Sequence, residues 1–319
     1  MISNRNKIKF SLSCDGKSIR TLEELRSNFS VEDILEYYSD EKQLLHRWLD
    51  VRGYKKELGQ VASIIETDEL EIIKKLINIF FGEDRDSAKF EEDVYIFKYQ
   101  KEREKRIKEY KRLSYAADII LKDYFDEYNN LVNEIIENNT NMAFIKSAIK
   151  EIDNKYSTIY QLEHRKILYL FLDKAPLAIP AMLMNENMRK NYLLSGDETA
   201  EQAHAEEVSN VNKTINDDKN QMYNGITDMM YHYDTLKSIL GDNLKEVSYN
   251  TDGNWDELEE NKGKFMIIYT LNTAQIRASQ NRDRDGILDS DDVNGKFVII
   301  EGIDYRSQSD DDLLLYMEV

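Results

Sequence analysis

The chain of 319 residues carries 43 basic and 61 acidic side chains, which gives it a net charge of −18. Its single cysteine, Cys14, excludes a disulfide framework and a cysteine-rich zinc site. No apolar run reaches the roughly 18 residues that a membrane helix needs. The polar N-terminal stretch Met1–Phe10 lacks the apolar core of a signal peptide. The sequence therefore predicts a soluble, cytoplasmic protein without a membrane partner.

The acidic charge is concentrated toward the C-terminal end. Residues 176–319 carry 13 basic and 28 acidic side chains, a net charge of −15. A duplex DNA-binding surface is disfavoured there, because phosphate binding requires lysine and arginine. Acidic clusters of this kind can hold metal ions, can contact basic partners, or can simply keep the protein soluble.

Glycine and proline mark the same division of the chain. No glycine lies between Gly82 and Gly196, and the only prolines are Pro176 and Pro180. Long glycine-free stretches rich in Glu, Lys, Leu and Ile are typical of helices. We therefore predict a mainly α fold with a small β-rich or α+β C-terminal part. The expected domains are a small short-helix module over 1–82, a long helical hairpin or bundle over 83–175 and an acidic α+β domain over 176–319.

The N-terminal module contains recurrent helix-start signals. A short strand is expected at Ile8–Leu12, followed by an Asp15-Gly16 turn, and Gly53 is the expected end of a helix. Hydroxyl side chains that precede acidic residues cap free backbone N–H groups at helix starts. Such starts are expected at Thr21, Ser30, Ser39 and Thr67.

Two segments carry a resemblance to known sequences. Residues 22–58 (LEELRSNFSVEDILEYYSDEKQLLHRWLDVRGYKKEL) resemble the N-termini of uncharacterised bacterial proteins. The C-terminal end, from GKFVIIEGIDYRS to LLLYMEV, likewise resembles a bacterial family. The resemblance implies no established activity and transfers no catalytic residue. A role in phage defence or stress response rests on it alone.

Apolar spacing predicts two or three long helices between Ser87 and Lys174, with a break at Asn138–Asn141. Within them, residues 98–112 (KYQKEREKRIKEYKR) hold eight basic and three acidic side chains. This segment predicts contact with nucleic acid or with an acidic partner. The alternative is a solvated helix face with ion pairs such as Glu104–Lys108.

The segment NRDRDGILDSDD over 281–292 resembles an EF-hand-type calcium loop. Such a loop winds around the ion because oxygen ligands alternate along it and a glycine makes the sharp turn. Asn at its first position and Asp at its last depart from the pattern, and an Asp/Asn-rich surface turn is the alternative. The expected Ca²⁺ ligands are Asn281, Asp283, Asp285, the carbonyl of Ile287, Asp289 and Asp292.

Other candidate sites are sparser. Asp228 and His232 stand four residues apart in an expected amphipathic helix, a spacing that offers two metal ligands on one face. We interpret Trp48 as a core residue and expect the nearby His46 on the more exposed side of its helix. The chain has no phosphate-binding loop, dinucleotide fingerprint or nucleophile elbow.

Two near copies, Gly263–Ile268 and Gly295–Ile300, are β-rich and predict a small sheet together with Leu313–Met317. These patterns favour a cytoplasmic protein that acts through protein–protein contact or regulation, without an evident catalytic motif. Two alternatives remain: a nucleic-acid-associated factor that uses helix 98–112, and a metal-dependent enzyme centred on Asp228 and His232.

Overall fold

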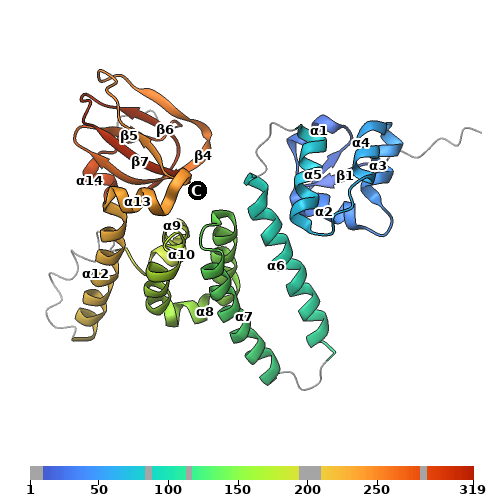
Figure 1. Cartoon of the computed structure of the whole chain (residues 1–319), viewed down its shortest axis with the longest axis horizontal. Coiled ribbons are helices and arrows are strands. Elements are labelled where there is room, and N and C mark those ends of the chain that lie inside the picture. Colours follow the sequence, from blue (N-terminus) through green and yellow to red (C-terminus); the bar gives the residue numbers. More distant parts are fainter. Residues whose placement is uncertain (1–9, 83–87, 113–116, 194–209, 281–285) are drawn as a thin grey trace, which may run out of the picture. The chain divides into compact units, whose positions relative to one another are not determined.

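The computed structural model describes residues 10–82, 88–112, 117–193, 210–280 and 286–319. Over these residues the chain is mainly helical, and an antiparallel sheet follows near the C-terminal end (Figure 1), which confirms the predicted fold class. The chain forms two compact units: Met1–Asn130 with Lys146–Glu151, and Leu131–Ile145 with Ile152–Val319. The three expected domains stay a prediction.

The first unit begins with a β-hairpin that is followed by short helices and then by long ones. The hairpin closes at Asp15 and Gly16, which both have positive φ values of 49° and 70°. This is the turn geometry that matches the twist of a two-residue hairpin. The elements are β1 (Leu12–Cys14), β2 (Lys17–Ile19), α1 (Leu22–Ser27), α2 (Val31–Ser39), α3 (Leu44–Arg52), α4 (Lys55–Ala62), α5 (Glu69–Phe81), α6 (Ala88–Tyr110) and α7 (Ala117–Glu137).

Local capping explains where several of these helices begin and end. Thr21 accepts a hydrogen bond from the backbone N–H of Glu24, and Ser30 accepts one from that of Asp33, as expected. Gly53 ends α3 with a φ of 86°, a left-handed conformation that favours glycine.

Two expected helix starts are wrong. The helix predicted to begin at Ser39 begins at Leu44, because the Asp40 carboxylate accepts from the backbone N–H of Lys42 and closes a turn instead. At α5 the cap is Asp68 instead of Thr67, since the Asp68 carboxylate accepts from two backbone N–H groups in the first turn.

The core of the first unit is built mainly from the short helices. Trp48 is fully buried in it, as predicted, and Cys14 lies in the same core. Two residues of α6, Val94 and Phe97, also belong to this cluster. The N-terminal core therefore includes the beginning of the first long helix.

The second unit places helices before a sheet. Its long helix α8 is kinked at Tyr156, and Asn141 caps its start, which confirms the predicted break. The division between the two units passes through α7 and α8. The helices are α8 (Met142–Lys174), α9 (Ala178–Met184), α10 (Glu186–Arg189), α12 (Asn210–Tyr231), α13 (Tyr233–Leu240), the 3₁₀ turn η1 (Gly241–Asn243) and α14 (Ser290–Val293).

The sheet is antiparallel, with its strands in the order β3-β7-β4-β6-β5. The expected strand at Gly263–Ile268 lies within β4, whereas the one expected from Gly295 starts only at Ile299. The strands are β3 (Lys245–Val247), β4 (Asp256–Leu271), β5 (Gln275–Arg277), β6 (Ile299–Arg306) and β7 (Leu313–Glu318). Among the described residues, no helix combines the length and apolarity that crossing a membrane requires.

Candidate functional site

Half of the basic side chains in segment 98–112 are engaged within the first unit. Arg103 donates two hydrogen bonds of 2.6 and 2.7 Å to the buried carboxylate of Glu151. Glu104 lies 3.9 Å from Lys101, and the expected Glu104–Lys108 pair is not formed. The ion pairs from this segment to other elements are Lys98–Asp68, Lys98–Glu69, Lys101–Glu36, Arg103–Glu151 and Arg106–Glu127.

The other half of these side chains projects into solvent. Each is exposed and makes no hydrogen bond or ion pair to another side chain of the described residues. Two of them, Lys105 and Lys108, continue the helix face of Lys101 at spacings of four and three residues, and the other two follow the end of α6 at Tyr110. The four residues are Lys105, Lys108, Lys111 and Arg112.

Apolar side chains are exposed in the same part of the first unit. Of the twelve large hydrophobic side chains exposed in the described residues, five lie between 107 and 125. These five are Ile107, Ile119, Ile120, Leu121 and Phe125. We call them, together with the four exposed basic residues of segment 98–112, the hairpin-end surface.

The apolar stripe of α7 continues from a buried half into an exposed half. Leu121, Phe125, Tyr128 and Val132 follow one another at spacings of four, three and four residues, so they share a helix face. Tyr128 and Val132 are 1% and 5% exposed, whereas Leu121 and Phe125 are 57% and 50% exposed. The exposed half therefore has the character of a core face that nothing in the first unit covers.

Two polar contacts align α6 and α7 antiparallel (Figure 1). The Tyr110 hydroxyl donates to Asp123 over 2.8 Å, and one turn away Arg106 pairs with Glu127. Loss of hydration, together with the hydrogen bond to Asp123, raises the pKa of Tyr110, so the phenol stays a donor at neutral pH. These contacts hold the basic stripe and the apolar stripe on one hairpin.

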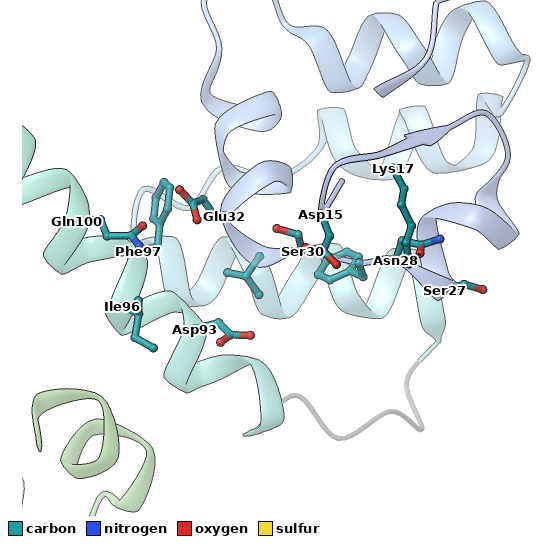
Figure 2. Close-up of a pocket in the computed structure, with 12 residues that line it drawn as sticks. Asp15, Lys17, Ser27, Asn28, Ser30, Glu32, Asp93, Ile96, Phe97 and Gln100 are labelled. Carbon is teal, nitrogen blue, oxygen red and sulfur yellow. Dashed lines mark hydrogen bonds between the residues drawn. The ribbon is translucent and has the colours of Figure 1, made fainter. Parts of the chain in front are cut away.

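A second feature of the first unit is a cavity of about 370 Å³ between the β1–β2 turn, the start of α2 and one face of α6. Figure 2 shows Asp93 and Phe97 reaching from α6 on one side, with Asp15 and Ser30 on the other. Loss of hydration raises the pKa of the Asp93 carboxyl, and the positive charge of Lys150 opposes this shift.

Only part of the predicted calcium loop can be placed. Asn281, Asp283 and Asp285 lie outside the described residues. Asp289 caps α14 by accepting from the backbone N–H groups of Asp291 and Asp292, and Asp292 accepts in return from the N–H of Asp289 over 3.1 Å. This capping box brings two expected ligands together, and calcium binding stays a prediction. The carbonyl of Ile287 precedes them in the loop.

The other candidate residues do not gather into a site. The helix expected to hold Asp228 and His232 is interrupted: α12 ends at Tyr231, and His232 is the first residue outside α13. Both side chains are exposed. Among the residues described, no three His, Cys, Asp or Glu side chains converge as metal ligands.

The two remaining nucleophile or base candidates are buried to different extents. Burial raises the pKa of the Cys14 thiol to about 12, with a smaller contribution from the charge of Asp33. The thiol is therefore protonated at neutral pH and unsuited to attack a substrate. His46 is half-buried, less so than Trp48 on the same helix, and burial lowers its pKa.

No family model matches the chain, and neither the curated proteins nor the solved structures contain a match. Its function is therefore argued from the residues themselves. Sequence reasoning missed the cavity beside α2, because its walls come from residues 15–32 and 93–100. It also missed the apolar half of the hairpin-end surface, because the exposed and the buried residues of α7 belong to one continuous apolar stripe in the sequence.

Proposed function

We propose that this chain is a protein-binding regulatory factor whose hairpin-end surface docks an acidic amphipathic helix of a partner protein. The observation that carries the proposal is the exposed apolar stripe of α7, which belongs to the same helical hairpin as basic side chains of segment 98–112 that have no carboxylate partner among the described residues. An apolar centre flanked by charge is the usual composition of a helix-docking surface.

The apolar part supplies the attraction. Burying a Leu or Phe side chain completely contributes about 1.5–3 kcal/mol. Leu121 and Phe125 are 57% and 50% exposed, so a partner that covers both contributes roughly half of that amount at each residue. Large apolar residues that are exposed together in this way are frequent at protein interfaces.

The basic part selects the partner. Lys105, Lys108, Lys111 and Arg112 are four exposed basic residues, against three exposed acidic residues in the same segment, Glu102, Glu104 and Glu109. A partner that carries Asp and Glu gains favourable charge contacts with these basic side chains. A second copy of the same surface would bring like charges together, which disfavours self-association through it.

Nucleic-acid binding by helix 98–112 is the second candidate, and the exposed basic residues favour it as well. Single-stranded nucleic acid is held by basic side chains together with aromatic rings on which bases stack. The exposed apolar neighbours here are aliphatic except for Phe125. This composition suits a protein partner better than a nucleic acid.

The test uses fluorescently labelled probes and the full chain. One probe is a synthetic amphipathic helix with leucines on one face and glutamates beside them, and the second has lysines in place of the glutamates. Single-stranded and duplex DNA complete the set. We expect the acidic helix to bind and the basic helix to fail, as measured by fluorescence anisotropy.

Charge reversal locates the binding surface. Lys105→Glu with Lys108→Glu is expected to weaken binding of the acidic helix by about tenfold. Lys55→Glu with Lys56→Glu is the matched control, because both residues are exposed on α4 and the change in net charge is the same. Equal weakening in both variants would contradict the proposal. Salt-sensitive binding of DNA without binding of the acidic helix would favour the nucleic-acid candidate.

A further inference from the structure

The cavity beside α2 offers hydrogen-bonding and charged groups together with an apolar wall. Its volume of about 370 Å³ accommodates a side chain or a small organic molecule. Asp93, Ile96, Phe97 and Gln100 line it from α6, where they follow one another at spacings of three, one and three residues (Figure 2). The opposite wall consists of Asp15, Lys17, Ser27, Asn28, Phe29, Ser30, Val31 and Glu32.

Several polar groups of the lining already have partners within the first unit. The Lys17 ammonium donates to the side-chain oxygen of Asn28 over 2.9 Å. The Ser27 hydroxyl donates to the carbonyl of Glu23, and the Ser30 hydroxyl accepts from the N–H of Asp33. These groups are therefore less available to a ligand.

The carboxylates of the lining are different. Asp15, Glu32 and Asp93 make no side-chain hydrogen bond or ion pair within the described residues. The charge of Glu32 raises the pKa of Lys101 without a direct contact. The charge of Lys150 acts on Asp93 in the same way and lowers the pKa of that carboxyl. The lining therefore carries three carboxylates against one ammonium, with the Lys101 ammonium 5.2 Å from the centre of the Phe97 ring, and this excess of negative charge favours a positively charged ligand.

The arrangement of these carboxylates favours an organic cation over a metal ion as the occupant of the cavity. A divalent metal ion requires ligands that converge on one point at about 2–2.6 Å. No such group of side chains exists in the described part of the chain. Carboxylates spread around a cavity with Phe97, Ile96 and Val31 in its wall fit a larger cation with an apolar stem.

We propose that this cavity binds the ammonium or guanidinium group of an organic cation, supplied by a free amine or by a Lys or Arg side chain of a peptide. Asp93 and Glu32 face the charge from α6 and α2, and the Phe97 ring lies beside the stem. This site is separate in sequence from the hairpin-end surface, so each proposal can fail alone.

The experiment measures ligand binding to the full chain by saturation-transfer NMR and calorimetry. The probes are N-acetyl-arginine methylamide and spermidine, which stand for the peptide and the free amine. The neutral control is N-acetyl-citrulline methylamide, which keeps the shape of the arginine probe and loses its charge. We expect at least one cationic probe to bind, and the citrulline probe not to bind. The cationic probe that binds with the higher affinity shows whether the cation comes from a peptide side chain or from a free amine.

Variants locate the site. Glu32→Gln with Asp93→Asn is expected to weaken binding by about fivefold, since each removes one partly exposed charge without changing side-chain shape. Glu41→Gln with Glu102→Gln removes the same charge from exposed positions outside the cavity and is expected to leave binding unchanged. Failure of both cationic probes to bind would overturn the proposal. Equal binding of citrulline and arginine, or equal weakening in the two double variants, would overturn it as well.

Discussion

The buried carboxylate of Asp312 provides a stringent test of the structure of the sheet. Its side chain is completely buried, just before β7. One oxygen accepts from the backbone N–H of Thr273 over 2.8 Å. The other accepts from the Thr273 hydroxyl and from the backbone N–H groups of Gln308 and Ser309, at 2.8, 3.1 and 3.2 Å. The carboxylate thus joins the turn after β4 to the turn before β7.

Replacing this carboxylate should lower the free energy of unfolding of the sheet. A hydrogen bond to a charged group contributes about 1.5–3 kcal/mol, and bonds to one acceptor are not additive. We therefore expect Asp312→Ala to cost about 3 kcal/mol and Asp312→Asn, which keeps one accepting oxygen, roughly half of that. Asp310→Asn is the control, because that side chain is exposed, and it should change stability by less than about 0.5 kcal/mol.

The same carboxylate makes the free energy of unfolding depend on pH, and the shift of its pKa determines the direction. Hydrogen bonds lower the pKa of Asp312 in the folded chain, and they outweigh the opposing effect of burial. Its contribution is therefore fully present above the unfolded pKa of about 3.9. It is lost as the pH falls through the folded pKa. The stability difference between the chain and Asp312→Asn should shrink in this acidic range.

Urea denaturation followed by hydrogen exchange of the β4 and β7 peptides measures the stability of this sheet separately from the rest of the chain. A cost below about 0.5 kcal/mol for Asp312→Ala would refute the described network. If the stability difference between the chain and Asp312→Asn stays constant as the pH falls below the unfolded pKa, the conclusion that the Asp312 carboxyl is ionised in the folded chain would be refuted.

Three further predictions concern other parts of the chain. Arg103→Met should cost about 1–3 kcal/mol in urea denaturation, because it leaves the buried Glu151 carboxylate without its bidentate partner; an unchanged midpoint would contradict this pair. Cys14, with its pKa raised to about 12, should resist alkylation by iodoacetamide at pH 8 until the chain unfolds; rapid labelling of the native protein would show that the thiol is accessible. If the predicted loop binds calcium, calorimetry should detect heat that Asp283→Ala with Asp285→Ala abolishes, and absence of heat from the intact chain would end that prediction.

Local sequence signals accounted for much of the helical architecture. The caps at Thr21 and Ser30, the glycine at the end of α3 and the asparagine-rich break before α8 were predictable, because each depends on a few neighbouring residues. The interruption of the helix at His232 has no glycine or proline beside it, so no local signal announced it.

The candidate sites depend on contacts between distant residues, which periodicity does not encode. Arg103 is paired with Glu151, 48 residues away, so the basic segment presents fewer free charges than its composition indicates. The cavity beside α2 combines residues 15–32 with residues 93–100. The sequence does not show that Phe125 is exposed and Val132 is buried, because both belong to the same apolar stripe of α7.

The most direct test of the central claim measures the affinity of the acidic amphipathic helix for Phe125→Ser and for Leu162→Ser. Both residues are exposed hydrophobic side chains, at 50% and 82%, but only Phe125 belongs to the hairpin-end surface. We expect Phe125→Ser to weaken binding about tenfold, as loss of a central interface residue does, and Leu162→Ser to leave it within about twofold. Equal affinities of the two variants would contradict docking at this surface.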